Sequence, residues 1–153
     1  MTTQSEGTFP HAPEGLRVQK IDHLGVAVHS IEEALPMYAG ILGLECVAIE
    51  TVEDQKVKTA FLPVGGTNIE LLEPTAPDSP VAKFLDKRGP GVHHVAYRVD
   101  DVARELERLK GEGVRLVDET PRRGAGGALI AFLHPKATGG ILVELCQRDS
   151  EHH

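Results

Sequence analysis

The chain has 153 residues, 41% of them hydrophobic and 25% charged, a balance typical of a globular protein and long enough for one domain. Sixteen basic residues against 23 acidic ones give a formal net charge of −7. This charge argues against nucleic acid as a partner, because a phosphate backbone requires a basic surface. No apolar run approaches the ~20 residues that span a bilayer, so we expect no membrane association either.

The cysteines and the chain ends indicate where the protein works. Cys46 and Cys146 have no C-x-x-C spacing, which favours a reducing, cytoplasmic location over a disulfide framework or a cysteine zinc site. Residues 1–18 are polar, rich in proline and glycine, and unlike a signal or transit peptide, so they predict a disordered arm. Residues 149–153 are expected to form a flexible tail or a tag remnant.

Two parts of the chain resemble each other. KIDHLGVAVHSIEEA (20–34) and GVHHVAYRVDDVARE (91–105) both begin as an alternating strand that carries a histidine and continue with an acidic helix start. The first helical pattern begins at Ile31 and ends near Gly43. Three strands are then expected, at 44–51, 57–64 and 67–73, with Gly65-Gly66 as a hairpin turn.

The second part repeats this order after a short connection. Residues 78–89 predict a connecting helix, capped by Asp78 or Ser79 with Pro80 in its first turn. After the second repeated segment, a helical pattern begins at Val102 and ends near Gly111. Three more strands are expected, at 115–118, 128–133 and 140–146.

The predicted fold class is therefore α+β, built from two tandem βαβββ modules. They span 19–75 and 90–148, and together they form a single domain over 19–148. We expect their strands to make a cupped, barrel-like, eight-stranded mixed sheet.

The adjacent histidines His93 and His94 face opposite sides of their strand, because strand side chains alternate. His94 shares its face with the small residue Ala96, and His23 shares its face with Gly25. Both of these histidines therefore point to a side that could line a cavity. His93 lies on the bulky apolar face and is expected to be structural.

A glutamate lies among aliphatic residues in the last strand of each module, Glu70 in NIELLEP and Glu144 in ILVELCQ. A buried carboxylate is costly unless it is paired or binds a cation. Two imidazoles and two carboxylates would neutralise a divalent ion, and mixed nitrogen and oxygen ligation suits several metals. A lone strand histidine is commonly a hydrogen-bonded core residue, but matching positions in both modules favour a metal site. The predicted ligands are His23, Glu70, His94 and Glu144; the metal, among Co, Mn, Ni, Zn and Mg, stays open.

Several stretches resemble the methylmalonyl-CoA epimerases, a family of the vicinal-oxygen-chelate (glyoxalase-like) superfamily: IDHLGVAV, AFLPVGGTNIELLEP, GPGVHHVAYRVDDV, AFLHPK and GGILVELCQ. The resemblance covers about residues 19–147. It implies paired βαβββ modules around one divalent metal, the same four ligands, and a homodimer. Some of these epimerases have glutamine at the position of Glu70, where lactoylglutathione lyases have acidic ligands.

The resemblance also implies an isomerase that interconverts (2R)- and (2S)-methylmalonyl-CoA through an enolate, with the metal as Lewis acid. Inversion of C2 needs acid–base groups on both faces of the enolate. Some family members have a glutamate base where this chain has Thr59, which cannot accept a proton at neutral pH. Glu144 is therefore the predicted catalytic residue, with Glu70 as the second candidate.

An acyl-CoA substrate brings phosphate groups that need cations. The loop PRRGAGG (121–127) supplies Arg122 and Arg123, and Lys136 follows in HPKATGG. Glycines allow close backbone approach and arginines bind phosphates, so these three cations are predicted CoA contacts. A solvated loop with ordinary surface charge explains them equally well. For Arg98, a surface role or an internal ion pair is favoured over a ligand contact.

Three alternatives remain open. A lactoylglutathione lyase would isomerise a hemithioacetal with the same metal chemistry. An extradiol-type dioxygenase would use two histidines and one carboxylate on iron, although Glu70 as a fourth ligand would crowd the positions that oxygen needs. A non-catalytic binding protein of the same superfamily would bind a small molecule in a comparable cleft, often without metal.

Overall fold

The computed structural model describes residue 10 and residues 18–149. Most of the predicted N-terminal arm and C-terminal tail lies outside these residues. The strands are β1 (Lys20–Ala27), β2 (Ala48–Val52), β3 (Val57–Val64), β4 (Thr67–Pro74), β5 (Gly91–Arg98), β6 (Arg122–Arg123), β7 (Leu129–Leu133) and β8 (Val143–Gln147). The helices are α1 (Ile31–Leu35), its π-helical continuation η1 (Pro36–Ile41), α2 (Pro80–Arg88) and α3 (Val102–Gly111). Short 3₁₀ turns are η2 (Glu53–Gln55), η3 (Ala125–Gly127) and η4 (Pro135–Thr138).

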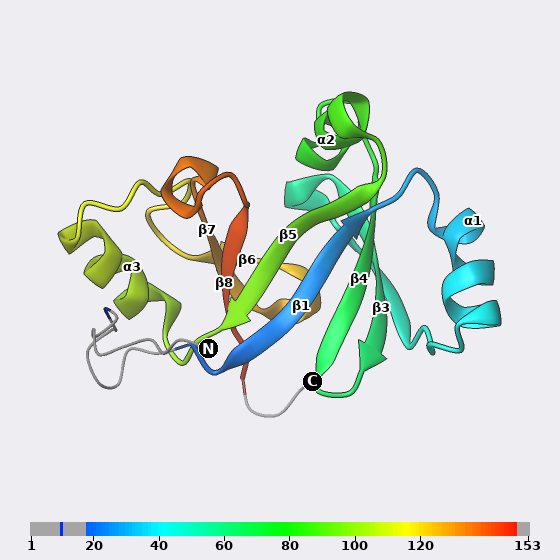
Figure 1. The fold of residues 1–153 in the computed structure, drawn as a ribbon, viewed down its shortest axis with the longest axis horizontal. Helices are drawn as coiled ribbons and strands as arrows, with labels where there is room; N and C mark the ends of the chain where they lie inside the picture. The colour runs from blue at the N-terminus through cyan, green and yellow to red at the C-terminus, as the bar shows by residue number, and fades with distance from the viewer. Residues whose placement is uncertain (1–9, 11–17, 150–153) are drawn as a thin grey trace, which may run out of the picture.

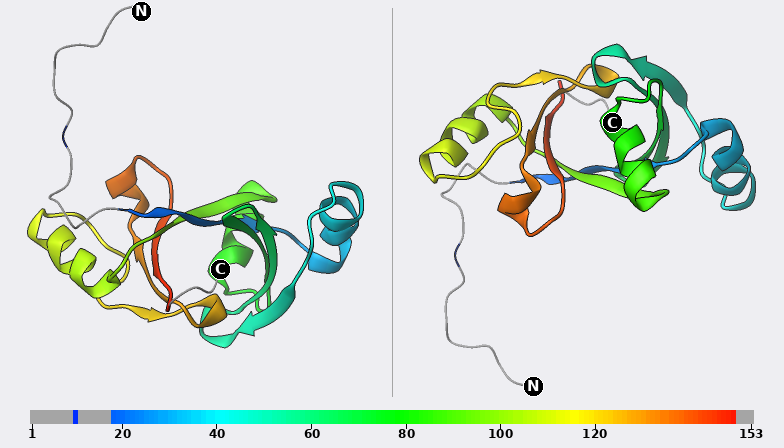
Figure 2. Two further views of the ribbon diagram at one scale, coloured as in Figure 1. Left: turned by 90° about the horizontal axis from the view of Figure 1, so that it is seen from below. Right: turned by 90° about the horizontal axis from the view of Figure 1, so that it is seen from above.

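All eight strands form one mixed sheet in the order β2-β3-β4-β1-β5-β8-β7-β6 (Figure 1). Within each module the first strand pairs in parallel with the last, β1 with β4 and β5 with β8. The two modules join through the antiparallel pair β1–β5. Figure 2 shows that the sheet curves round into a cup, with α1 and α3 on the outside at opposite ends. The predicted duplicated α+β fold is confirmed.

Part of the apolar core lies between the outer face of the sheet and helices α1 and α3, and two further apolar clusters line the concave side. Leu71 of β4 packs in the cluster that includes Ile31 of α1, and Leu145 of β8 packs with Val102 and Leu106 of α3. Strand side chains alternate, so the residue before each of these leucines points to the concave side. Those residues are Glu70 and Glu144.

Helix α2 connects the modules close to the predicted position. Ser79 caps it by accepting hydrogen bonds from the backbone N–H groups of Val81 and Ala82, and Pro80 occupies its first turn. Asp78, the other predicted cap, forms an ion pair with Lys56 instead. In Figure 1, α2 lies beyond one end of β4 and β5, away from α1 and α3.

Three predicted strands differ from the structure. Residues 115–118 contribute only an isolated bridge between Leu116 and Leu133. The two-residue strand β6 comes next in the chain and pairs with β7. The Asp118 carboxylate accepts the Phe132 N–H, while the N–H groups of Val117 and Asp118 both donate to the Phe132 carbonyl, so the regular ladder ends there. The strands expected at 44–51 and 140–146 begin later, at Ala48 and Val143.

None of the helices within residues 18–149 combines the length and the apolar character needed to cross a membrane.

Candidate metal centre

The four predicted ligands lie on four neighbouring strands in the middle of the sheet. His23 is on β1, Glu70 on β4, His94 on β5 and Glu144 on β8. All four side chains are buried, with at most 6% of any residue exposed. They line one small cavity on the concave side of the cup. The sheet therefore brings together residues that are 121 positions apart in the chain, from His23 to Glu144.

Three of the four residues form a compact set of metal-binding atoms. His23 Nε2 lies 3.2 Å from His94 Nε2 and 3.6 Å from Glu144 Oε1, and His94 Nε2 lies 3.1 Å from the same oxygen. One ligand atom from each residue falls within 4.8 Å of the other two. Two imidazole nitrogens and one carboxylate oxygen at this spacing can bind a first-row divalent ion.

Glu70 lies beside this set, on the other side of the His23 ring. Its Oε2 is 3.4 Å from His23 Nδ1 and 3.7 Å from an Arg148 guanidinium nitrogen. Among the described residues, this buried oxygen makes no hydrogen bond. A buried carboxylate oxygen without a hydrogen bond is costly, so the position favours a bound cation or a proton.

Asp22 is a site residue that the sequence analysis missed. Strict alternation would turn Asp22 away from His23, but the β1–β5 pairing has an irregularity between Ile21 and His23. The fully buried Asp22 carboxylate lies 2.7 Å from His23 Nδ1 and also accepts hydrogen bonds from Arg98 and Arg148. It therefore orients the ring so that Nε2 faces His94 and Glu144. The sequence signal for Asp22 is its position directly before the predicted ligand His23.

The ion pairs around Asp22 also show what Arg98 does. Its guanidinium forms an internal ion pair with Asp22 at 2.8 Å. This is one of the two roles that the sequence favours for Arg98. Arg148, which no pattern had identified, makes the matching ion pair at 2.9 Å. The two cations keep the Asp22 carboxylate charged inside the protein.

His93 supports the second histidine ligand from the other side. Its Nδ1 lies 2.9 Å from His94 Nδ1, and its ring meets the Phe84 ring edge-on at 5.1 Å. Burial, together with the charge of His94, lowers the pKa of His93 to about 4. A neutral His93 can accept the His94 Nδ1–H, which leaves His94 Nε2 free to bind a metal. The expectation that His93 turns to the face opposite His94 is therefore wrong. The β1–β5 register shifts between Gly25 and Val26, so His93 has no partner in this pairing, and both rings line the same pocket.

The carboxylates of the site are electrostatically different. Burial alone would raise the pKa of Glu144, but the charge of His23 and hydrogen bonds with both ligand histidines hold it well below its usual range. Burial raises the pKa of Glu70 to about 7, although His23 opposes the shift. The structure therefore contains one carboxylate that stays ionised and one that protonates near neutral pH.

Cys146 approaches the same region but is a poor metal ligand. Its sulfur lies within 4.8 Å of ligand atoms of Asp22 and His23. Burial and the nearby charge of Glu144 raise the pKa of its thiol far above the usual value. The neutral thiol, beside an aspartate already held by two arginines, does not make a second metal site. Both Cys46 and Cys146 are free.

The three cations predicted to contact phosphates lie outside the cavity. Arg122 is ion-paired with Asp118 at 3.1 Å, and its guanidinium lies over the Phe132 ring. Arg123 donates to the Gly127 carbonyl of its own loop, and Lys136 is exposed. Arg122 lines a hollow together with His93.

Comparison with known proteins identifies the superfamily. The pattern of the glyoxalase/bleomycin resistance protein/dioxygenase superfamily matches residues 22–132. The chain belongs to this superfamily. The match covers the strands that carry His23, Glu70 and His94.

Relatives in this superfamily point to one family. An uncharacterized Bacillus subtilis protein, YqjC, is 44% identical over 89% of this chain and 97% of its own length. The ethylmalonyl-CoA/methylmalonyl-CoA epimerase of Cereibacter sphaeroides is 39% identical over 85% of this chain and 98% of its own. A variant of Streptomyces coelicolor methylmalonyl-CoA epimerase, solved with 2-nitronate-propionyl-CoA, superposes with a TM-score of 0.85 at 37% identity, covering 90% of this chain and 99% of that one. The expected membership of the methylmalonyl-CoA epimerase family, and with it the assignment as an isomerase, is confirmed.

Proposed function

We propose that the protein is a divalent-metal-dependent epimerase that interconverts (2R)- and (2S)-methylmalonyl-CoA. The observation that carries this proposal is the buried set of His23, His94 and Glu144, drawn from both modules into one cavity. The names of the relatives supply the substrate, because two of them are epimerases of short-chain malonyl-CoA thioesters.

The residues fit a divalent ion. Although burial opposes the shift, the carboxylates of Glu70 and Glu144 raise the pKa of His23, so the ring would release its proton when an ion binds. The two imidazoles and the ionised Glu144 would then supply three ligand atoms, and the Oε2 of Glu70, which lacks a hydrogen bond, is the proposed fourth. Asp22 and His93 fix the orientation of the two rings from behind. A bound ion would act as a Lewis acid toward the oxygens of the substrate and would stabilise the negative charge formed when the C2 proton leaves.

Proton transfer then depends on the two glutamates. Glu144 is the proposed base, since it is ionised and lies at the centre of the set. Glu70 is the second candidate, because a carboxyl group with a pKa of about 7 can both accept and return a proton near neutral pH. Thr59 is buried in the same cavity, where its hydroxyl can hold a hydrogen bond but cannot serve as a base at this pH.

Contacts of Arg122, Arg123 and Lys136 with the CoA phosphates stay a proposal, as does the homodimer. The position of Arg122 beside His93 supports the phosphate contacts. Alanine at Arg122 and Arg123 is expected to raise KM for the thioester if this loop holds phosphate. Sedimentation of the purified protein measures its mass in solution and so checks the homodimer.

The decisive experiment incubates the purified protein with one methylmalonyl-CoA epimer in deuterated water and a panel of divalent metals. We expect metal-dependent appearance of the other epimer, with solvent deuterium at C2. The His94→Ala variant is the control, and it should lose both signals. No exchange with any metal would contradict the proposal, and isomerisation of a methylglyoxal–glutathione hemithioacetal instead would favour a lactoylglutathione lyase.

A further inference from the structure

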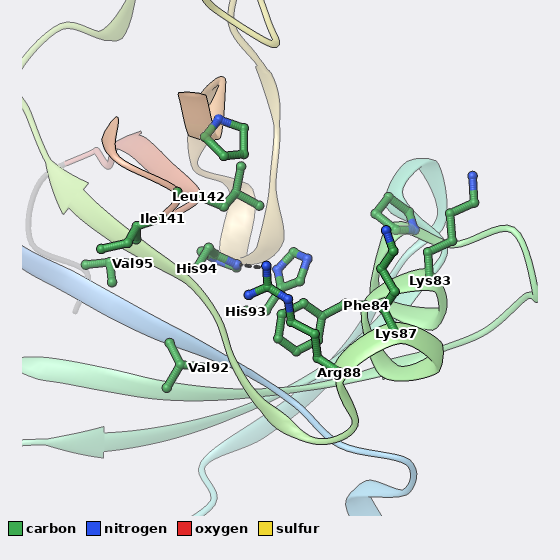
Figure 3. A pocket seen from close by; sticks show the side chains of 13 residues that line it. Lys83, Phe84, Lys87, Arg88, Val92, His93, His94, Val95, Ile141 and Leu142 are labelled. Atoms are coloured by element: carbon green, nitrogen blue, oxygen red, sulfur yellow. Dashed lines mark hydrogen bonds between the residues drawn. The ribbon is translucent and has the colours of Figure 1, made fainter. Parts of the chain in front are cut away.

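Two pockets lie towards opposite ends of the cup. The larger one, of about 740 Å³, lies between α2 and the segment 135–142, beside the edge of β5 at 91–94 that β8 leaves unpaired (Figure 3). The smaller one, of about 240 Å³, lies next to the β3–β4 turn, at the end of the cup away from α2 (Figure 1). Its volume is below the ~300–1,000 Å³ that is usual for pockets of drug-sized ligands, so it suits a smaller molecule.

Side chains of different chemistry line the smaller pocket. The apolar ones come from β3 and the start of β2, and the polar ones come from β2, β4 and the chain that follows β8. They are Val47, Phe61 and Pro63, and then Glu50, Asn68 and Arg148. Arg148 lines the metal cavity as well, so it lies between the two spaces.

Asn68 is a buried amide without a hydrogen-bond partner. Only 5% of the residue is exposed, and within residues 18–149 its side chain makes no hydrogen bond. It lies two positions before Glu70 on β4, so both side chains point to the concave side. A buried amide normally pairs both its carbonyl and its NH₂ group. A polar molecule in the pocket would provide the partners that the protein does not.

A cation and an anion of this pocket lie against the same glycine. Nε and Nη2 of Arg148 donate to Asp22, while Nη1 donates to none of the described residues. This Nη1 lies 3.0 Å from the position that a Cβ atom on Gly126 would occupy. The Gly126 N–H donates to Glu50 Oε1 at 3.0 Å. In the described part of the chain, the opposite charges of Glu50 and Arg148 nevertheless form no ion pair with each other, so a ligand that carries both charges can pair with each.

The apolar side of the pocket is close to the same point. Cε1 of the Phe61 ring lies 3.9 Å from that Cβ position on Gly126, and Val47 and Pro63 extend the apolar lining. A matching ligand therefore combines an anionic group, a cationic group and a short apolar group. An α-amino acid has this arrangement, because its ammonium and carboxylate groups are attached to the carbon that bears the side chain.

We propose that this pocket binds a free α-amino acid with a small apolar side chain. Its carboxylate accepts hydrogen bonds from Asn68 and from Arg148 Nη1, and its ammonium group donates to Glu50. Its side chain packs against Phe61. Charge-assisted hydrogen bonds of this kind are stronger than those between neutral groups. A simple carboxylate would place an anion beside Glu50, and a simple amine would place a cation beside Arg148, so we expect each to bind more weakly.

Calorimetric titration of the full chain with L-valine and D-valine tests this inference. We expect saturable binding of one enantiomer and at least tenfold weaker binding of the other, because three separate contacts orient the molecule. Isovalerate lacks the ammonium group of valine and isobutylamine lacks its carboxylate, so both should bind at least tenfold more weakly. The assay needs neither a metal nor a thioester, so its outcome does not depend on the proposed function.

Two variants locate the site. Glu50→Gln removes the anion, and Asn68→Leu replaces the amide with an apolar side chain of similar size. Each should weaken valine binding about tenfold or more. Glu45→Gln is the matched control, since it removes an exposed carboxylate that does not line the pocket, and its binding should equal that of the unmodified protein. Thermal unfolding checks the fold of all three, and the partly exposed Glu50 keeps the test valid even if Asn68→Leu is unstable.

Three results would overturn the inference. The first is no binding of either enantiomer, or equal binding of both. The second is undiminished valine binding by Glu50→Gln, which would place the ligand elsewhere. The third is isovalerate binding as tight as that of valine, which would indicate a plain anion site at Asn68 and Arg148.

Discussion

Gly25 and His94 lie directly opposite each other in the antiparallel pair that joins the two modules. A Cβ atom on residue 25 would lie 2.3 Å from His94 Cε1, far inside van der Waals contact. The imidazole therefore occupies the space that the missing side chain leaves. One module supplies the proposed ligand His94, and the other leaves space for its ring at Gly25.

Gly25→Ala is expected to push the His94 ring out of the set of ligands. We expect at least a tenfold loss of metal affinity and a decrease of about 1–3 kcal/mol in the free energy of unfolding, typical of overpacking in a dense interior. Metal titration and denaturant unfolding measure the two effects. Gly91→Ala is the matched control on β5, where a Cβ meets nothing within 4 Å. Equal behaviour of the two variants would contradict this account.

Glu144→Gln preserves the size of the side chain but removes the charge and the base. We expect epimerisation to fall on the order of 10³-fold even with excess metal, whereas the fold is retained. Exchange of the C2 proton in deuterated water measures the loss, and circular dichroism checks the fold. Near-normal turnover would remove Glu144 from both the ligand and the base role.

Asp22→Asn leaves Arg98 and Arg148 facing a neutral amide. Removing one partner of a buried ion network costs about 3–5 kcal/mol, so thermal and denaturant unfolding should show a large destabilisation. Metal affinity should also fall about 10- to 100-fold, because His23 loses the group that orients it. Asp78→Asn removes an exposed partner of Lys56 and should leave the free energy of unfolding nearly unchanged. A mild effect of Asp22→Asn would show that His23 is oriented by other contacts.

Glu70→Gln should stabilise the metal-free protein in a pH-dependent way. The folded-state pKa of Glu70, about 7, lies above its ordinary value of 4.5, so the folded protein favours the protonated form. The free energy of unfolding therefore falls as pH rises from about 4.5 through 7, and glutamine avoids this loss. With a chelator present, the free energy of unfolding of the variant should exceed that of the unmodified protein at pH 8 but not at pH 4.5.

Denaturant unfolding at the two pH values measures this gain. Glu45→Gln removes an exposed carboxylate and should change the free energy of unfolding by no more than about 0.5 kcal/mol at either pH. A gain for Glu70→Gln that is equal at both pH values would show that Glu70 does not carry the raised pKa.

Metal should stabilise the folded chain, because the ligands converge only in the native sheet. At a free metal concentration 100 times Kd, the free energy of unfolding should rise by about 2.7 kcal/mol. Chelation should reverse the accompanying rise in Tm. His94→Ala, which removes one ligand, should abolish the response, and an undiminished response in that variant would place the ion elsewhere.

Strand periodicity and duplication determined most of this structure in advance. The two-residue alternation in NIELLEP and ILVELCQ separates Glu70 from Leu71 and Glu144 from Leu145, so each glutamate had to lie on the face opposite its helix. Helix caps are equally local, and Ser79 begins α2 where the sequence places it. Such features depend only on neighbours along the chain.

Long-range pairing decided the rest. Asp22 reaches the same ring as its neighbour in sequence only because the β1–β5 register shifts, and residues 115–118 lose their strand to a hydrogen bond between Asp118 and Phe132. The open edge of β5 beside α2 likewise depends on where β8 begins to pair. Alternation along one strand sets which side chains share a face, but the distance between strands and the point where pairing stops depend on packing between segments far apart in the chain.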